Sequence, residues 1–447
     1  MVDKIREIAL KTLYKIDKEK AFSNIVLNEM INNNQKELKT RDIGLISEIT
    51  YGVVTWKLTI DSIIEKHSKI KLKKISPWII NILRMGIYQI IFLDKIPKSA
   101  AVNESVNLAK KYGNRGSIGY VNAVLRKVSE KDYEELKKIE DDIERLSKVY
   151  SMPKWIIQKL SEEKTLTEVE EICRSSNLRP SLSIRVNTLK TNKEELIKKL
   201  NKQNIENIEG VIDDFLILKK SSGVEKIEGF KEGLFSIQDE AAGLTAKILN
   251  PKEGEEVLDC CSSPGGKTTY LAEIMKNTGK IIAWDLYLHR VDLVRQNAKR
   301  LAITNIETEV NDASVYNEKY INKFDKILLD VPCMGIGVLK RKPDIKWNRE
   351  EKDILEIGNI QKNILETCSK YLKVGGKLVY STCSILKEEN KEIIEEFLAN
   401  NENFEIEKIK LENNNYFNKY LEKEGTLQVY QNEISDGFYI CKIFRTY

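Results

Sequence analysis

The sequence predicts a multidomain protein with an all-helical N-terminal domain, a small α+β middle unit and an α/β domain built on a doubly wound sheet. A length of 447 residues exceeds what one ordinary hydrophobic core holds. Apolar residues recur at helical spacing in the first third, whereas strand and helix patterns alternate in the second half. We therefore expect domains over residues 1–140, 145–235 and 236–447.

The N-terminal third is predicted to be helical and basic. Helical spacing of apolar residues runs through residues 4–16, 46–67 and 77–93, and Pro77 suits the first turn of the last helix. Residues 1–140 contain 26 Lys and Arg against 17 Asp and Glu, although the whole chain carries a net charge of only +5. This asymmetry indicates a polyanionic partner, most simply nucleic acid, unless the lysines form only a solvated surface.

The middle unit shows a change of pattern near residue 180. Residues 181–189, "SLSIRVNTL", alternate as a strand does, and a helical pattern follows over 192–203. Two more strands are expected at 215–220 and 233–238. Arg185, within the first of these strands, is a candidate for contact with the phosphates of a nucleic acid.

The C-terminal part alternates strands and helices in the order typical of a mostly parallel, doubly wound sheet. The expected strands are residues 255–260, 279–285, 306–312, 324–330, 375–382 and 437–445. The expected helices are residues 267–277, 288–303, 349–372 and 387–400.

The stretch "VLDCCSSPGGKTTY" (257–270) ends in Gly266-Lys267-Thr268, which is also how a phosphate-binding loop ends. Such a loop requires glycine five residues before its last glycine, and this chain has Cys261 there. Pro264 has no backbone N–H, so the loop also has one fewer donor with which to bind a phosphate. We therefore discount binding of ATP.

The same loop fits a different nucleotide-like cofactor. A turn of small residues after the first strand lets a ligand approach the backbone closely. Asp285 ends the second strand, where an acid accepts hydrogen bonds from both ribose hydroxyls. Asp312 follows the third strand and is placed to contact an adenine amino group. A turn, a ribose acid and an adenine acid without a phosphate clamp predict S-adenosylmethionine as the cofactor.

Two of the seven cysteines stand where chemistry is expected. Cys333 follows the fourth strand in "LLDVPCMGIG", and Cys383 follows the fifth in "VYSTCS". Because the carboxyl ends of parallel strands converge on one crevice, both should face the cofactor loop. Four others are predicted to be inert, buried thiols: Cys173, Cys260, Cys368 and Cys441.

Composition excludes several other classes of protein. No apolar run reaches the roughly 18 residues that a membrane span needs, and the N-terminus lacks the pattern of a secretory signal. We therefore expect a cytoplasmic protein with reduced thiols. With only two histidines and no C-x-x-C pair, no metal site is expected.

The motifs "CCSSPGGKTT", "DVPCMGIG" and "YSTCS", in this order, resemble those of the RNA (cytosine-5) methyltransferase family. The resemblance covers the chain from about residue 180, since "IRVNTLK" and "FSIQDEAAGL" are similar to that family as well. "ALKTLYKI", "VNESVNLAKKYG" and "YVNAVLRKV" resemble the helical NusB-like RNA-binding domain. The combination resembles the members of the family that act on 16S ribosomal RNA. One departure is that Ser262 and Ser263 stand where the family commonly has two alanines.

The resemblance implies a Rossmann-like, class I methyltransferase domain and a role for each site residue. Cys383 would attack carbon 6 of cytosine, which makes carbon 5 nucleophilic, and Cys333 would resolve the adduct. Asp330 would lie at the cytosine edge and near the cofactor, and Lys267 would either orient Asp330 or lower a cysteine pKa. The cofactor-binding residues implied are Cys261, Ser262, Ser263, Pro264, Gly265, Gly266, Lys267, Asp285, Asp312 and Asp330.

The expected partner is 16S ribosomal RNA, free or in a small-subunit assembly intermediate, bound by a monomer without metal or membrane. The rival from another class is a non-catalytic RNA-binding factor for ribosome assembly or antitermination, since the N-terminal domain alone resembles one. A DNA cytosine methyltransferase would share the chemistry but should lack the cysteine of the Thr-Cys motif.

Overall fold

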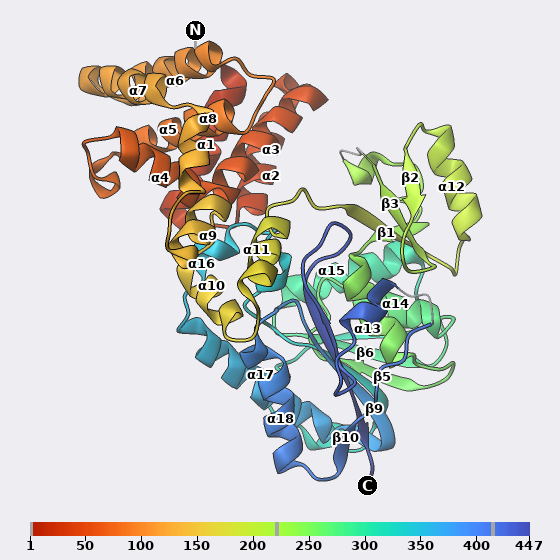
Figure 1. Cartoon of the computed structure of the whole chain (residues 1–447). Coiled ribbons are helices and arrows are strands. Elements are labelled where there is room, and N and C mark those ends of the chain that lie inside the picture. The colour runs from red at the N-terminus through yellow and green to blue at the C-terminus, as the bar shows by residue number, and fades with distance from the viewer. Residues whose placement is uncertain (1–2, 220–222, 413–415) are drawn as a thin grey trace. The chain divides into compact units, whose positions relative to one another are not determined.

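A computed structural model of the chain describes residues 3–219, 223–412 and 416–447 (Figure 1). The chain divides into two compact units, each made of two segments. The first unit comprises Met1–Leu178 and Leu339–Glu351, and the second comprises Arg179–Val338 and Lys352–Tyr447.

The first unit is helical, as predicted, and its described residues contain no strand. Its helices are α1 (Lys4–Glu19), α2 (Ser23–Asn33), α3 (Thr40–Thr55), α4 (Lys57–His67), α5 (Pro77–Ile91), α6 (Lys98–Tyr112), α7 (Arg115–Lys127), α8 (Glu130–Leu136), α9 (Asp142–Tyr150), α10 (Lys154–Ser161), α11 (Leu166–Ser175) and α16 (Ile345–Asn348).

Helix α5 is the central element of this unit, because ten of its fifteen residues are buried. Its start follows local rules: the side chain of Ser76 accepts a hydrogen bond from the Ile79 N–H, and Pro77 occupies the first turn as predicted. A buried arginine, Arg84, lies on the same helix and pairs with Asp17 of α1 and Asp61 of α4. These carboxylates compensate a charge that would be costly to bury alone.

A segment from the second half of the chain completes the first unit. Trp347 of α16 donates its indole N–H to the carbonyl of Val54, at 2.7 Å. Lys346 is buried, and its amine lies 2.6 Å from Asn177 Oδ1. Burial lowers the pKa of Lys346 to about 7. The helical unit is therefore closed by residues far along the chain, which no local pattern indicates.

The second unit begins with a four-stranded antiparallel sheet in the order β2-β3-β1-β4. Its strands are β1 (Leu182–Val186), β2 (Asn207–Glu209), β3 (Phe215–Leu218) and β4 (Phe235–Ile237), and its helix is α12 (Lys193–Lys202). The predicted small α+β fold is thus confirmed, and its strands lie between Leu182 and Ile237. Of the strand predicted over 215–220, the last residue lies outside the described part of the chain.

The larger sheet has the order β10-β12-β9-β8-β5-β6-β7, with β11 paired to β12. The strands are β5 (Glu256–Asp259), β6 (Lys280–Asp285), β7 (Ile306–Val310), β8 (Phe324–Asp330), β9 (Leu372–Thr382), β10 (Phe404–Ile406), β11 (Leu427–Val429) and β12 (Phe438–Arg445). Strands β7, β6, β5, β8 and β9 are parallel, whereas β10, β11 and β12 add antiparallel pairs. The predicted doubly wound fold is confirmed, with a mixed edge.

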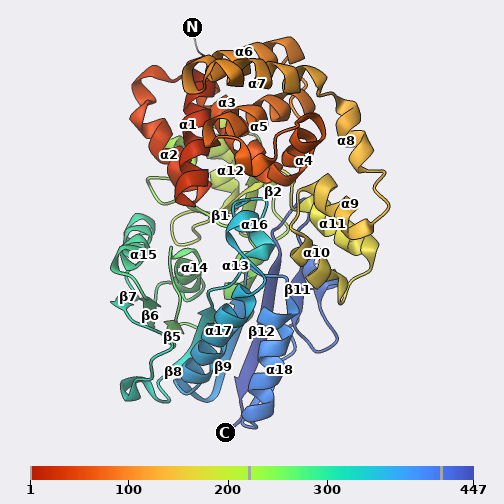
Figure 2. The same ribbon diagram turned by 90° about the vertical axis from the view of Figure 1, so that its left-hand side faces the viewer.

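Helices cover both faces of this sheet, and alternate residues of each strand face different helices. Their bounds are α13 (Glu240–Leu249), α14 (Gly266–Ile274), α15 (Leu288–Leu301), α17 (Asp353–Ser369) and α18 (Lys391–Asn400). Val257 and Leu328 pack in the core with α13, α14 and α15. Leu258 and Leu329 pack in the core with α17 and α18. Figure 2 shows these two helices beside β8, β9 and β12. This arrangement leaves the carboxyl ends of the parallel strands free to carry a site.

Among the described residues, no helix is both long and apolar enough to cross a membrane.

Candidate functional site

The predicted site residues follow the carboxyl ends of neighbouring parallel strands. Asp285 ends β6 and Asp330 ends β8, while Cys383 comes one residue after the end of β9. Strands β8 and β9 pair so that Asp330 lies beside Ser381. The structure therefore gathers these residues at one edge of the sheet, as the strand pattern predicted.

The loop after β5 is held to β6 by its serines. Ser262 donates both its backbone N–H and its hydroxyl to the carbonyl of Trp284, each at 2.8 Å. The N–H of Ser263 donates to Asp285 Oδ2 at 3.3 Å. Gly265 adopts a φ of +102°, and a Cβ there would lie 3.2 Å from the backbone of Val294. Glycine is thus required to turn the chain into α14 this close to α15.

The acid at the end of β6 has an unused acceptor. Asp285 is only 3% exposed, yet its Oδ1 accepts no hydrogen bond from any described residue. Arg290 Nε lies 3.3 Å from Oδ1 and forms an ion pair with it, but the two atoms do not form a hydrogen bond. A buried carboxylate oxygen without a donor is costly, and a ribose hydroxyl would supply that donor. This orphaned oxygen fits the adenosine part of S-adenosylmethionine.

The predicted adenine contact is less clearly formed. Asp312 is exposed, and its Oδ1 accepts from the N–H and the hydroxyl of Ser314, at 2.9 and 2.7 Å. The neighbouring Asn311 has a buried side-chain N–H group that finds no acceptor among the described residues. Asn311 was not among the predicted site residues, and it is as well placed in the sequence as Asp312 to meet a base.

The two predicted cysteines are adjacent. The sulfur atoms of Cys333 and Cys383 lie 3.1 Å apart, and neither residue is fully buried. Lys267 Nζ lies 2.7 Å from Asp330 Oδ2, and the Ser381 hydroxyl donates to Asp330 Oδ1 at 2.9 Å. Two thiols, an ammonium and a carboxylate, all predicted from separate motifs, are therefore brought to one site.

The charges of this cluster depend on one another. Burial opposes the charge on Lys267, but Asp330 and then Cys383 outweigh it and raise the lysine pKa. The pKa of Cys333 is raised well above its usual range, first by its hydrogen bond with Cys383 and then by burial. Cys333 therefore keeps its proton, while Cys383 is the cysteine that interacts electrostatically with the Lys267 ammonium.

The four cysteines predicted to be inert are buried: Cys173, Cys260, Cys368 and Cys441. The thiol of Cys261 in the loop also has its pKa raised well above its usual range, by burial. The raised pKa keeps the Cys261 thiol protonated, which makes it a poor nucleophile.

A buried glutamate that the sequence analysis missed joins the two cysteine loops. Glu389 is fully buried; its Oε1 accepts from the Met334 N–H at 2.7 Å, and its Oε2 accepts from the Ser384 hydroxyl. These two partners directly follow Cys333 and Cys383. The charged stretch around Glu389 is typical of a solvated helix start, so only the tertiary structure shows that its carboxylate holds the thiols in register.

Arg185 was predicted to contact the phosphates of a nucleic acid, and the burial of its side chain contradicts that prediction. Its side chain is 0% exposed, and its five N–H groups are all used. Two go to Glu273, at 2.8 and 3.2 Å, and one goes to the Gly266 carbonyl at 2.8 Å. The other two go to Gln238 and to Thr269. Arg185 therefore anchors β1 to the first turn of α14, directly behind the cofactor loop.

Asn187, two residues along, has a similar role. Its side-chain amide donates to the carbonyls of Gly233 and Leu301, at 2.8 and 3.0 Å, and it is also fully buried. The segment "IRVNTLK" therefore attaches the middle unit to the helices of the large sheet.

Asp259 at the end of β5 is a second buried acid beside the loop. Its Oδ2 accepts from the Thr268 hydroxyl at 2.7 Å, while its Oδ1 has no partner among the described residues. Burial raises the pKa of Asp259 to about 7. The group therefore stays protonated in the folded protein at pH values where the unfolded chain has lost the proton.

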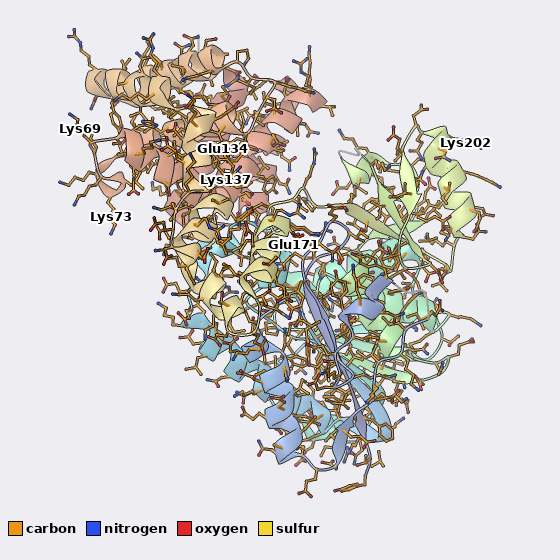
Figure 3. The ribbon with its side chains drawn as sticks, in the orientation of Figure 1. Lys69, Lys73, Glu134, Lys137, Glu171 and Lys202 are labelled. Atoms are coloured by element: carbon orange, nitrogen blue, oxygen red, sulfur yellow. The ribbon has the colours of Figure 1, made fainter. Side chains whose placement is uncertain are left out.

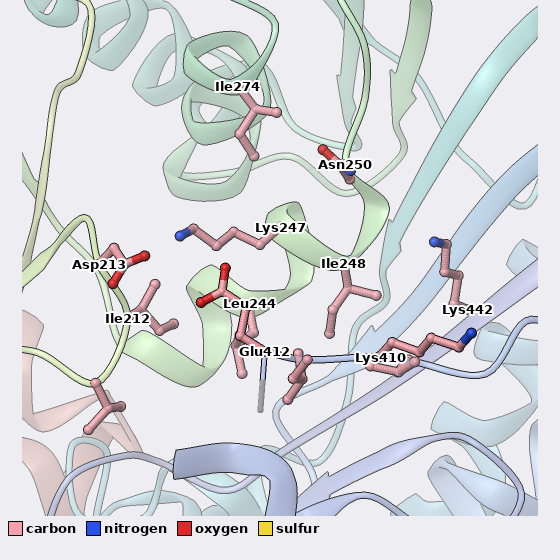
Figure 4. Close-up of a pocket in the computed structure, with 13 residues that line it drawn as sticks. Ile212, Asp213, Leu244, Lys247, Ile248, Asn250, Ile274, Lys410, Glu412 and Lys442 are labelled. Carbon is pink, nitrogen blue, oxygen red and sulfur yellow. The ribbon is translucent and has the colours of Figure 1, made fainter. Parts of the chain in front are cut away.

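A separate hollow of the second unit contains none of the predicted site residues. It has a volume of about 670 Å³, and Figure 4 shows it between α13 and the loop that follows β10. Its cationic lining residues are Lys247, Lys410 and Lys442, and its acidic ones are Asp213 and Glu412. Because charges of both signs line it and no cysteine does, we assign it no catalytic role.

No group of three or more His, Cys, Asp or Glu side chains within residues 3–219, 223–412 and 416–447 is arranged to hold a metal ion.

Replacing Arg185 with alanine should lower the free energy of unfolding by about 3–5 kcal/mol, because Glu273 would remain buried without its counter-ion. Arg295→Ala is the matched control, since Arg295 pairs with Asp292 on the surface, where an ion pair contributes less than about 1 kcal/mol. Urea titration of the full chain, followed by circular dichroism, measures both. Equal losses in the two variants would contradict the anchoring role.

Asp259→Asn should change how stability depends on pH. Since the folded-state pKa of about 7 lies above the ordinary value of 3.8, the wild type loses stability as pH rises between those two values. The asparagine variant should gain about 2 kcal/mol relative to the wild type between pH 5 and pH 7. Urea titrations at the two pH values test this, and parallel changes in both proteins would refute it.

Comparison with known proteins supplies three family matches along the chain. Residues 246–444 match the family model described as 16S rRNA methyltransferase RsmB/F. Residues 3–130 match the NusB family, and residues 152–225 match the RsmF/B-like ferredoxin-like domain.

Relatives and solved structures resemble the chain over most of its length. A probable ribosomal RNA small subunit methyltransferase B of Bacillus subtilis is 36% identical, over 98% of both chains. A ribosomal RNA small subunit methyltransferase B of Shewanella oneidensis is 34% identical, over 88% of this chain and 90% of the relative. The crystal structure of PH0851 is 28% identical with a TM-score of 0.82, over 100% of both chains. A methyltransferase homologue from Pyrococcus horikoshii is 30% identical with a TM-score of 0.58, over 69% of this chain and 100% of that one.

Proposed function

The chain belongs to the RsmB/F family of S-adenosylmethionine-dependent rRNA methyltransferases, and we propose that it methylates carbon 5 of a cytosine in 16S ribosomal RNA. The resemblance found from the three sequence motifs is confirmed at the level of the family. The observation that carries the finer proposal is the pair of sulfur atoms 3.1 Å apart, beside the Lys267–Asp330 ion pair. Methylation of an oxygen or an exocyclic nitrogen does not require a cysteine nucleophile, so two adjacent thiols favour methylation of a ring carbon.

Carbon 5 of cytosine is too weak a nucleophile to accept a methyl group unaided. In the proposed reaction the Cys383 thiolate forms a bond to carbon 6, and the electron pair displaced from the ring double bond makes carbon 5 nucleophilic. Bound S-adenosylmethionine supplies the methyl group. Water then takes the proton from carbon 5, the electron pair of that C–H bond re-forms the ring double bond, and the bond from sulfur to carbon 6 breaks to release Cys383 as a thiolate.

We assign the two cysteines by their surroundings. Cys383 interacts with the Lys267 ammonium, which favours a thiolate, and the raised pKa of Cys333 favours a thiol. Cys333, at 3.1 Å, is therefore suited to act at the adduct after methyl transfer and to promote its release. This is the same division of roles that the sequence resemblance implied.

Asp330 and Lys267 are proposed to hold the base. Asp330 would accept a hydrogen bond from the cytosine amino group, which orients the ring for attack at carbon 6. Lys267 would hold the Asp330 carboxylate in its orientation, since its ammonium lies 2.7 Å from Oδ2. We therefore propose both roles considered for Lys267, orientation of Asp330 and stabilisation of the Cys383 thiolate.

The cofactor residues are proposed from the loop and the two acids. The loop from Cys261 to Gly266 would face the methionine part, and Asp285 would bind the ribose through its orphaned oxygen. Asp312, with Asn311 beside it, would lie at the adenine, and Asp330 would border the sulfonium end. We further propose that the protein acts as a cytoplasmic monomer without metal, on 16S rRNA or a small-subunit assembly intermediate.

Label transfer tests the proposed activity. The purified protein, incubated with methyl-tritiated S-adenosylmethionine and unmodified 16S rRNA, should place label in 5-methylcytosine, identified after nuclease digestion. Bisulfite sequencing of rRNA from a deletion strain should show one cytosine newly converted. Binding of the RNA without any transfer, to free rRNA or to particles, would favour the rival interpretation as a non-catalytic assembly factor.

The two cysteine variants should fail differently. Cys383→Ala should lower the rate of transfer by roughly 10⁴- to 10⁶-fold, as removal of a covalent nucleophile does. Cys333→Ala should instead accumulate a covalent protein–RNA complex that survives denaturing electrophoresis. Cys261→Ala is the control and should do neither. If Cys383→Ala still methylates and Cys333→Ala traps no RNA, the assignment is wrong.

A further inference from the structure

Two long stretches of the helical unit contain cations and no acids. Residues 66–93 include five lysines before α5 and no Asp or Glu, and residues 105–129 likewise include no Asp or Glu. These stretches are separated in the sequence by Asp94 and Glu104. A run of like charges is often only a solvated surface. The question is therefore whether the folded protein brings these two stretches next to each other.

Three contacts place the two stretches side by side. The rings of Trp78 and Tyr112 stack with centroids 4.6 Å apart. The hydroxyls of Ser68 and Tyr120 lie 2.6 Å from each other. Gly113 packs so closely that a Cβ on it would lie 2.8 Å from Ile79 Cδ1. The loop between α4 and α5 therefore lies against the turn between α6 and α7, and their cations share one end of the unit.

The cations gathered there form what we call the basic face, defined as Lys69, Lys71, Lys73, Lys74, Lys110 and Arg115. All six are exposed, and none makes an ion pair with any residue that the structure describes. Figure 3 shows Lys69 and Lys73 extending from the loop that precedes α5. The neighbouring Lys66 and Lys111 differ, because they pair with Asp132 and Glu7.

The support beneath this face is rigid. Trp78 stacks on Tyr14 as well as on Tyr112, with the Tyr14 and Trp78 centroids 3.7 Å apart and their planes 2° from parallel. This three-ring stack ties α1, α5 and α6 together directly beside the lysines. The Trp78 indole N–H donates to no described residue. The stack holds the backbone segments that bear the cations next to one another, so the chain itself needs little ordering when a polyanion binds.

The face lacks what a protein partner would need. Between residues 66 and 129 the only large hydrophobic side chain exposed among the described residues is Ile70, at 42%. Protein interfaces have an apolar, aromatic-rich core with few charges, whereas nucleic-acid interfaces are polar and strongly cationic. Unpaired lysines in a loop match phosphates, which accept point charges without demanding one geometry.

We propose that the basic face binds the sugar-phosphate backbone of rRNA outside the target cytosine. This inference rests on the proposed function for its substrate and adds the surface that holds it. Since lysines on phosphates carry no sequence information, the face contributes affinity and register, while the choice of base belongs to the catalytic site. Contacts of this kind release counter-ions, so their strength must fall steeply with salt.

The test uses the full-length protein with Lys69, Lys71, Lys73 and Lys74 all replaced by Gln. The matched control replaces four exposed lysines of the second unit, with the same change of charge: Lys252, Lys299, Lys410 and Lys423. The dissociation constant for 16S rRNA is measured by filter binding at several salt concentrations. For four lost phosphate contacts, the slope of log K against log salt should decrease in magnitude by about 3, and the control should keep the wild-type slope.

A second variant, Lys110→Gln with Arg115→Gln, changes the other side of the face and should lower the slope by about 1 to 2. Both variants should bind S-adenosylmethionine as the wild type does and should transfer methyl groups normally at saturating RNA.

If both variants keep the wild-type slope, the proposal that the basic face binds rRNA is wrong, even if the enzyme methylates RNA. The proposal is also wrong if the variants bind naked rRNA normally but bind small-subunit particles more weakly, because the partner of the basic face would then be a ribosomal protein. If the wild type transfers no label, the proposed function fails, while the binding slopes still decide the basic face.

Discussion

The ion pair between Lys267 and Asp330 is the constraint on which the catalytic site depends. Lys267 lies in the first turn of α14, and Asp330 is the last residue of β8, so the pair joins the cofactor loop to the centre of the sheet. Ser381 of β9 binds the other oxygen of the same carboxylate. One carboxylate thus ties together three elements, and the two partly buried charges compensate each other.

The cysteines derive their positions from this junction. Cys333 comes three residues after Asp330, and Cys383 comes two residues after Ser381, so a fixed pair of strand ends brings the two sulfur atoms together. Glu389 then binds the residue after each cysteine and prevents the two loops from separating. The reactive groups are therefore on short loops whose backbone is held by buried polar contacts.

The middle unit supports this site from behind. Arg185 satisfies the Gly266 carbonyl next to Lys267, and its charge is balanced by Glu273 of the same helix. The arginine motif had suggested RNA contact because an isolated cation in a strand gives no sign of a buried partner 88 residues away. Contact with RNA phosphates is instead a property we attribute to the helical unit, where cations remain exposed and unpaired. Anchoring and RNA binding thus fall to different parts of the chain.

Much of the fold followed from local patterns. The parallel strands of the large sheet were predicted from local sequence, and the structure brings Asp285, Asp330 and the two cysteines to the carboxyl ends of those strands. The strands β2, β10 and β11 were not anticipated; each has only three residues and pairs with a longer neighbour. The return of residues 339–351 to the helical unit was also unforeseen, since α16 has four residues and owes its place to Trp347 and Lys346.

The sequence by itself determined the class of fold, the loop that replaces a phosphate cradle, and the identities of the acids and thiols, because these depend on residue type and short spacing. Only the tertiary structure decided which charges are paired. Arg185 and Asp259 are buried, Lys66 is neutralised by Asp132, and Lys69 to Lys74 remain free of acids. The free energy of a charge depends on its burial and on partners distant in sequence, and no pattern of neighbouring residues contains that information.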